Sequence, residues 1–405
     1  MLKKASGLLA SFPRDFRLLV AATFIDRLGG FLIFPFLSLY VASKFQVGMT
    51  QVGIIFGLWS ISGLIGNMIG GNLADQYGRK IVLIFGLISS ALTGLLMGFI
   101  DDIRFFYFLA SFAGIFSDIG HPAQQAMVAD LLEENQRAEG YSLLRVVINV
   151  AAAIGPMIGG FLAGISYLML FIIDALASIL TALFVLKFIP ETKPLEGELN
   201  APGRLRKEKR QYGFVLTDTL FMAFICACIV LVSVYVQMYS TLSVFLNQVH
   251  QISETQFGFL MSINALMVVF LQYWLTKTIK GFPSMILMAM AAALYGVGFT
   301  LFGLTHTFGF FLFGMGIITF GEMVHMPVAQ ALVSQFAPID KRGRYMAVYG
   351  WTWAIPNSAA PLLAGLVMDN LNPNWVWYAS GIFSIIAIIM FLILQTRVHF
   401  EHEKA

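Results

Sequence analysis

Long apolar runs separated by short polar segments follow one another along most of the chain. Each run is long enough for a helix to cross the hydrocarbon core of a membrane, which takes about 20 residues. Alternation at period two is absent, so the pattern predicts helices rather than the strands of a membrane barrel. We therefore expect an all-α polytopic membrane protein with twelve transmembrane helices. The expected spans are residues 17–42, 51–74, 80–100, 104–127, 141–165, 167–189, 216–246, 254–278, 283–304, 307–331, 343–368 and 375–397.

Composition supports the same class of protein. Hydrophobic residues make up 58% of the 405 positions, charged residues only 12%, and the mean hydropathy is +0.80. These values lie outside the range of soluble domains. The N-terminus from Met1 to Pro13 is short and weakly basic, and the first apolar run lacks a small-residue cleavage site, so we expect no removable signal peptide. Cys226 and Cys228 are two residues apart in a predicted helix and point to different faces, so they cannot pair with each other.

Basic residues predict the orientation in the membrane, because Lys and Arg concentrate on cytoplasmic loops. With the N-terminus inside, only Lys44 and Arg104 fall on the outer side, and Arg27 lies within a helix. We therefore expect both termini to be cytoplasmic and the net charge of +3 to reflect topology rather than a nucleic-acid partner. The other 22 of the 25 basic residues fall on the cytoplasmic side: Lys3, Lys4, Arg14, Arg17, Arg79, Lys80, Arg137, Arg145, Lys187, Lys193, Arg204, Arg206, Lys207, Lys209, Arg210, Lys277, Lys280, Lys341, Arg342, Arg344, Arg397 and Lys404.

The chain divides into two related halves. The polar stretch from Pro190 to Gly213 separates six apolar runs from six others and is expected to be a solvated linker. The halves align at one constant offset of 205 residues, which indicates a duplicated six-helix unit with a pseudo-two-fold axis. We expect six-helix bundles at 1–189 and 216–405, joined by a cytoplasmic linker at 190–215. Matching residues include Thr50 and Thr255, Gln51 and Gln256, Gly53 and Gly258, Pro122 and Pro327, Pro156 and Pro361, and Gly160 and Gly365.

The loop between the second and third spans combines glycines with breakable charges, Asp75 and Arg79. It reads from Gly71 to Leu83 and resembles the signature loop of the major facilitator superfamily, G-x-L-A-D-x-x-G-R-K. This resemblance implies that Arg79 pairs with an acid ending the fourth span, here Asp130, and that Asp75 caps a helix of the other half. The expected conformational latch comprises Gly71, Asp75, Gly78, Arg79, Lys80 and Asp130. A purely topogenic turn is the alternative, and the corresponding loop at 276–283 has lost the acid.

The fifth span carries closely spaced small residues around a proline. The segment from Ala151 to Gly160 resembles the antiporter motif G-x-x-x-G-P-x-x-G-G, with Ala151 at its first position. In the family this motif accompanies proton-driven exporters, although close helix packing alone would also explain it. Many drug:proton antiporters carry an Arg in the fourth span, and this chain has none at 110–114. The expected switch residues here are Gly155, Pro156, Gly159 and Gly160.

Ionisable residues within the spans are candidates for function. An ionisable group at mid-membrane costs about 2.5–3.5 kcal/mol, so such groups normally face a cavity. Asp26, Asp118 and Glu322 lie in spans that line the central cavity in the resembling family, and they are the candidate proton carriers. Asp26 could instead neutralise the neighbouring Arg27 or Arg145. Asp174 is a weaker candidate, because its span is more peripheral in that family.

Two acid-x-x-His pairs occur at nearly equivalent points of the halves, and each pair shares one helix face: Asp118 with His121, and Glu322 with His325. Such pairs suit a proton relay or a substrate contact, and they also resemble the spacing of bundle metal sites. Histidines that only pack in the core are a further alternative. Arg145 and Asn149, one turn apart, are candidates for holding a polar substrate group or for a cytoplasmic gate.

The sequence carries no phosphate-binding glycine loop and no nucleophile-base pair. We therefore expect a transporter driven by an ion gradient rather than an enzyme, with no cofactor and no metal site. The leading hypothesis is proton-coupled export of a hydrophobic or amphipathic small molecule by a monomer in the bacterial cytoplasmic membrane, surrounded by lipids. The alternatives are a lipid or glycolipid flippase and a receptor-like protein that no longer transports.

Overall fold

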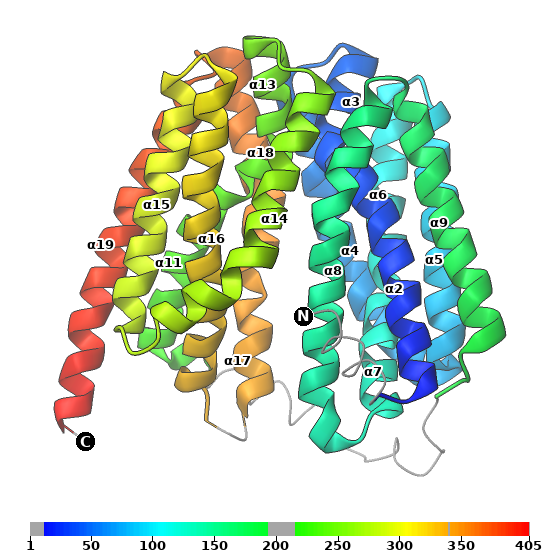
Figure 1. Ribbon diagram of the computed structural model, residues 1–405, viewed down its shortest axis with the longest axis horizontal. Helices are drawn as coiled ribbons and strands as arrows, with labels where there is room; N and C mark the ends of the chain where they lie inside the picture. The colour runs from blue at the N-terminus through cyan, green and yellow to red at the C-terminus, as the bar shows by residue number, and fades with distance from the viewer. Residues whose placement is uncertain (1–11, 193–214, 339–340, 405) are drawn as a thin grey trace. The chain divides into compact units, whose positions relative to one another are not determined.

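The computed structural model describes residues 12–192, 215–338 and 341–404, which are helical almost throughout and contain no strand. This confirms the all-α prediction, whereas residues 193–214 of the predicted linker lie outside the described residues. The helices of the first half are α2 (Arg14–Ile33), η1 (Phe34–Phe36), α3 (Leu37–Phe45), α4 (Met49–Tyr77), α5 (Arg79–Phe99), α6 (Ile103–Ile119), α7 (His121–Leu131), α8 (Glu134–Ala163) and α9 (Tyr167–Phe188). Those of the second half are α11 (Thr219–Tyr235), α12 (Gln237–Ser240), α13 (Leu242–His250), α14 (Glu254–Thr278), α15 (Ser284–Leu304), α16 (Phe308–Phe336), α17 (Arg342–Tyr349), α18 (Trp351–Asn370) and α19 (Trp375–Lys404) (Figure 1).

Within the described ranges, 11 helical segments are long and apolar enough to cross a membrane. The predicted span at 343–368 is not among them; it corresponds to α17, which ends at Tyr349, and α18, which begins at Trp351. Pro356 and Pro361 also lie inside α18, and each removes a backbone hydrogen bond. Eleven of the twelve predicted spans therefore correspond to these apolar segments, and the twelfth corresponds to the pair α17 and α18.

The chain forms two compact units. The first unit consists of the described residues within Met1–Val47, Ile54–Glu198 and Ser253–Ala265. The second unit consists of the described residues within Gly48–Gly53, Leu199–Ile252 and Leu266–Ala405. The beginning of α4 thus belongs to the second unit, and the beginning of α14 belongs to the first. Asp369 anchors the start of α4 by accepting hydrogen bonds of 2.8 Å from the backbone N–H groups of Met49 and Thr50.

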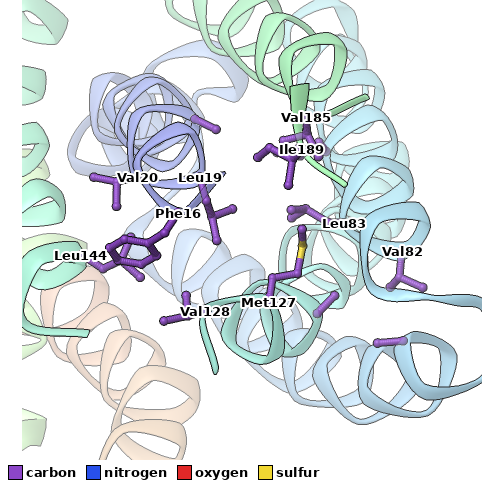
Figure 2. Close-up of a cluster of buried hydrophobic side chains, with 14 of the residues drawn as sticks. Phe16, Leu19, Val20, Val82, Leu83, Met127, Val128, Leu144, Val185 and Ile189 are labelled. Carbon is purple, nitrogen blue, oxygen red and sulfur yellow. The ribbon is translucent and has the colours of Figure 1, made fainter. Parts of the chain in front are cut away.

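A cluster of hydrophobic side chains closes one end of the first unit (Figure 2). It gathers the first turns of α2 and α5 and the last turns of α7 and α9, with Leu144 of α8 beside the fully buried Phe16. Leu19, Leu83 and Val185 belong to this cluster and also line the cavity described below. The cluster therefore forms part of the cavity wall.

Glycines allow α4 to approach α6 closely. A methyl group built on Gly66 would overlap the carbonyl oxygen of Ile115, and one built on Gly70 would overlap that of Ile119. Backbones come this close in membranes only where small residues replace larger ones. This contact fixes the position of the end of α6, where Asp118 lies.

His250 ends α13 in the second unit, beyond the apolar spans. Its ring lies 4.9 Å from those of Phe245 and Phe311 and 5.3 Å from that of His306, between centroids. Burial, followed by the nearby His306, lowers the pKa of His250. The buried Nε2 atom of His250 has no hydrogen-bond partner in the described part of the chain.

We expect Gly66→Ala to lower the melting temperature of the purified protein, because the added methyl group forces α4 and α6 apart at a cost of about 1–3 kcal/mol. Thermal unfolding in detergent measures the effect. Gly316→Ala is the matched control, since a methyl group there meets only the end of the Met267 side chain at 4.0 Å. An equal loss in both variants would contradict the proposed close contact.

We expect the protein to lose stability as the pH falls below about 6.5, partly because His250 must take up a proton in apolar surroundings. A lowered pKa means that the unfolded chain binds more protons than the folded one in this range, so stability rises with pH. His250→Gln should therefore show a smaller decrease in melting temperature between pH 7.5 and pH 5. Identical pH dependence in both proteins would exclude His250 as a contributor.

Candidate functional site

A cavity of about 310 Å³ lies within the first unit. Five of its lining residues carry ionisable side chains and come from α2, α6, α7 and α9: Asp26, Arg27, Asp118, His121 and Asp174. Hydroxyl groups of Thr23, Ser90, Ser117, Ser178 and Thr181 also line it. The first unit thus gathers three carboxylates and one guanidinium group in a polar space within an otherwise apolar bundle.

A side chain of α9 contacts the carboxylate of Asp26. The Oγ of Ser178 donates a hydrogen bond of 3.1 Å to Oδ1 of Asp26. Arg27 attracts the same carboxylate electrostatically, although no salt bridge within 4.0 Å joins the two in the structure. The Nε of Arg27 is buried and has no hydrogen-bond partner among the described residues. The acid and the base of α2 are therefore not a closed ion pair that would neutralise the site.

Asp118 and His121 flank a helix break, because α6 ends at Ile119 and α7 begins at His121. Both side chains line the cavity, as predicted for residues three apart. The structure shows no hydrogen bond between them; Nε2 of His121 instead lies 3.4 Å from Nε2 of Gln125. Gln124 donates a 2.7 Å hydrogen bond to Oγ1 of Thr23 and so ties α7 to α2 beside the cavity.

Asp174 of α9 lines the same cavity, although the sequence analysis ranked it below the other acids. Gly29 of α2 provides the space for it, since a Cβ atom there would lie 2.8 Å from Oδ1 of Asp174. Gly94 of α5 also borders this carboxylate, at 3.7 Å from such a Cβ position. Gly29 and Gly94 are far from Asp174 in the chain, so no local sequence signal marked them as its neighbours.

A neighbouring cavity of about 580 Å³ in the first unit contains the two α8 candidates, Arg145 and Asn149. Arg27 and His121 line both cavities. Tyr141, one turn before Arg145, donates a 3.1 Å hydrogen bond from its hydroxyl group to the carbonyl oxygen of Gln125. The first unit therefore brings together six of the eight predicted cavity residues around two adjoining spaces.

The other two candidates, Glu322 and His325, lie on α16 in the second unit. His325 is fully buried, and its Nδ1 lies 3.4 Å from the hydroxyl oxygen of Tyr295. Glu322 interacts electrostatically with Tyr235, Tyr239 and Tyr295. Three tyrosines, from α11, α12 and α15, thus lie close enough to Glu322 to interact with it electrostatically.

Aromatic rings extend this tyrosine cluster. The hydroxyl oxygens of Tyr235 and Tyr239 are 3.3 Å apart, and the rings of Tyr235 and Trp353 meet edge to face at 5.9 Å between centroids. Neither acid-x-x-His pair belongs to a group of three or more His, Cys, Asp or Glu that could hold a metal ion within the described ranges, so metal binding by these pairs gains no support.

The loop after α4 is held by two acids. Arg79 Nη1 lies 2.8 Å from Oδ2 of Asp130, which is the ion pair implied by the family resemblance. Glu191, beyond α9, was not predicted: its Oε1 accepts hydrogen bonds of 2.8 Å from the N–H of Arg79 and 3.3 Å from that of Lys80. Glu191 therefore caps the beginning of α5, where a carboxylate also interacts favourably with the helix dipole.

Gly78 makes this turn possible, because its φ of 113° is a conformation that other residues rarely adopt. Lys80 Nζ donates a 2.7 Å hydrogen bond to the carbonyl oxygen of Leu186, near the end of α9. Gly71 faces Pro122 of α7, and Asp75 is exposed in the last turn of α4. The described contacts join α5, α7 and the end of α9, and the switching role of these residues stays a prediction.

The glycine motif of α8 presents two contact faces. Gly155 and Gly159 lie against Phe31 and Leu32 of α2. Gly160, with the carbonyl oxygen of Pro156, instead lies against Gly258 near the start of α14. Small residues at this spacing therefore let α8 pack closely on two helices at the same level of the unit.

Comparison with known proteins gives a consistent result. A model of the Major Facilitator Superfamily matches residues 19–361 and 282–405. A Na+, Li+, K+/H+ antiporter of Planococcus maritimus is 26% identical over 413 residues, covering 95% of this chain and 96% of the relative. The class H tetracycline resistance protein of Pasteurella multocida is 32% identical over 181 residues, 44% of this chain and 45% of that protein.

The fold is also similar to that of solved transporters. The crystal structure of the nucleoside transporter NupG superposes with a TM-score of 0.78 at 13% identity, covering 94% of this chain and 99% of that one. At this identity the similarity concerns the fold alone.

We expect Glu191→Gln to destabilise the protein by about 1 kcal/mol, the usual effect of weakening a helix N-cap. Thermal unfolding in detergent measures this loss. Glu133→Gln is the matched control, because Glu133 occupies the N-cap position of α8 and makes no side-chain capping hydrogen bond. Equal melting temperatures for the two variants would show that Glu191 does not stabilise α5.

Proposed function

Because the chain belongs to the Major Facilitator Superfamily, we propose that it is a secondary transporter that exports a hydrophobic or amphipathic small molecule in exchange for protons. The observation that carries the proposal is the cavity of the first unit, where Asp26, Asp118 and Asp174 face one polar space. Carboxylates within a membrane-spanning bundle are costly to ionise, so they exchange protons readily when a second charged group enters or leaves.

Asp26 and Asp118 are the proposed proton carriers of the first unit. Arg27 interacts electrostatically with both, and it lines both cavities. The guanidinium group favours the charged form of each acid. Either acid can therefore lose its proton without leaving an uncompensated negative charge in apolar surroundings. Protonation of the acids would then weaken their electrostatic attraction to Arg27. His121 and Gln125 lie beside this pair and offer a route between the two cavities.

Glu322 is the proposed acid of the second unit. Its neighbours are tyrosines, whose hydroxyl groups donate and accept hydrogen bonds, and the aromatic rings of Tyr235 and Trp353 offer an apolar surface. These groups suit a substrate with an aromatic or aliphatic body and one polar group. The 32% identity to a tetracycline resistance protein over 44% of this chain supports a drug-like substrate.

A monovalent cation is the second candidate substrate. The Na+, Li+, K+/H+ antiporter of Planococcus maritimus matches 95% of this chain, far more than the tetracycline resistance protein does. In that case the carboxylates of the first unit would bind the cation and the proton alternately. Both candidates use the same proton carriers and differ only in what is exported in exchange for protons.

We further propose that the transporter is a monomer in the bacterial cytoplasmic membrane with both termini in the cytoplasm. The distribution of 22 of the 25 basic residues supports this orientation. The contacts of Arg79 with Asp130 and of Arg79 and Lys80 with Glu191 would then lie on the cytoplasmic side. They would hold one conformation and break in the other, as surface ion pairs between moving helices can.

We expect Asp26→Asn and Asp118→Asn each to reduce pH-gradient-driven flux at least tenfold in proteoliposomes, because an amide cannot carry the proton. Flux of labelled lipophilic cations, neutral drugs, lipids and 22Na+ is measured against an imposed pH gradient, with Glu322→Gln in parallel. Asp101→Asn is the control, since Asp101 is 90% exposed and pairs only with Lys44 in the described structure. If the flux of every compound were unaffected by the pH gradient and by all three substitutions, proton antiport would be refuted.

A further inference from the structure

We propose that one face of α9, together with Asp26 of α2, forms a binding site for a monovalent alkali cation within the first unit. The face consists of Asp174, Ser178 and Thr181, which line the same cavity as Asp26. This inference deepens the proposed function, and rests on it in one respect: the cation and the transported proton would compete for the same carboxylates.

The spacing along α9 places the oxygen donors together. Asp174, Ser178 and Thr181 are four and three residues apart, so their side chains lie on one face of the helix. The hydrogen bond from Ser178 to Asp26, 3.1 Å long, shows that this face meets α2 at the level of the second carboxylate. Two carboxylates and two hydroxyl groups therefore border one part of the cavity.

A second observation points to a ligand rather than to an acidic cluster alone. Thr181 is only 3% exposed, and its Oγ1 has no hydrogen-bond partner among the described residues although it lines the cavity. Leaving such a hydroxyl unsatisfied costs about 1–3 kcal/mol. The carboxylate of Asp174 likewise has no hydrogen-bond or ion-pair partner in the described ranges. A bound cation would satisfy both groups at once.

The charges that face the cavity favour a cation on the α9 side. Asp26, Asp118 and Asp174 oppose Arg27 and the titratable His121. Arg27 acts electrostatically on Asp26, Asp118 and His121, whereas Asp174 is influenced by the like charge of Asp26. Arg27 thus partly compensates Asp26 and Asp118, whereas no basic side chain within the described residues forms an ion pair with Asp174.

The donor types select the class of cation. The α9 face offers only carboxylate and hydroxyl oxygens, which are hard ligands, and it contains no sulfur or imidazole donor. Two carboxylates and two neutral oxygens match one positive charge after the partial compensation by Arg27. Divalent cations generally take six or more oxygen ligands with more carboxylates. The geometry therefore points to Li+, Na+ or K+.

The test is equilibrium binding of 22Na+ to the purified full-length protein in detergent at pH 8.5, with choline chloride holding the ionic strength constant. We expect saturable binding that unlabelled LiCl, NaCl or KCl displaces. Asp174→Asn should abolish it, and Thr181→Val should weaken the affinity at least tenfold. Thr181→Ser keeps the hydroxyl group and should bind like the parent, which separates loss of a ligand from misfolding.

Thr93→Val is the matched control, because Thr93 is a buried threonine of α5 whose hydroxyl is already bonded to the carbonyl oxygens of Ser89 and Ser90. Absence of saturable binding, equal affinities in Thr181→Val and the parent, or displacement by Mg2+ or Ca2+ at concentrations below those of the alkali cations would overturn the proposed site.

The same variants distinguish this inference from the proposed function. Flux driven by a pH gradient is measured in sodium- and potassium-free choline medium. Proton-coupled flux in a protein that binds no 22Na+ would overturn the cation site and leave proton antiport intact. Binding of 22Na+ that depends on Asp174 and Thr181, with no compound moved by the pH gradient, would support the site and refute the antiport mechanism.

Discussion

The cost of holding ionisable groups within an apolar helical bundle governs the architecture of the first unit. A charge in hydrocarbon surroundings is tolerated only if water, an opposite charge or hydrogen-bond donors replace its hydration shell. Asp26, Asp118, Asp174 and Arg27 meet this requirement by sharing one cavity. The glycines facing them follow from the same requirement, because a larger side chain at Gly29 would occupy the space that the carboxylate of Asp174 needs.

The cavity also depends on how closely its walls approach. α4 contacts α6 through Gly66 and Gly70, and α8 contacts α2 through Gly155 and Gly159. These contacts fix the helices that carry Asp118 and Asp26, and Ser178 adds a hydrogen bond to the carboxylate of Asp26. Beside the polar space, the hydrophobic cluster around Phe16 packs α2, α5, α7 and α9 together (Figure 2).

Hydrophobic patterning predicted the helices and the resemblance predicted the Arg79–Asp130 pair, since both depend on short, strongly constrained stretches of sequence. The rank of Asp174 could not be predicted, because a membrane helix is apolar on nearly every face and its pattern does not say which face meets a cavity. Glu191 was missed for a different reason. It lies 112 residues from Arg79 in the chain, and nothing local marks it as the cap of α5.

The exchange of helix beginnings between the two units has a consequence for biogenesis. Residues 253–265 complete the first unit, and residues 48–53 complete the second. During synthesis the N-terminal repeat therefore emerges before all of its packing partners exist, and it reaches its final contacts only after the start of α14 has been translated. The two units therefore do not coincide with two uninterrupted halves of the chain, and the contacts of the first unit are complete only once part of the second half has been synthesised.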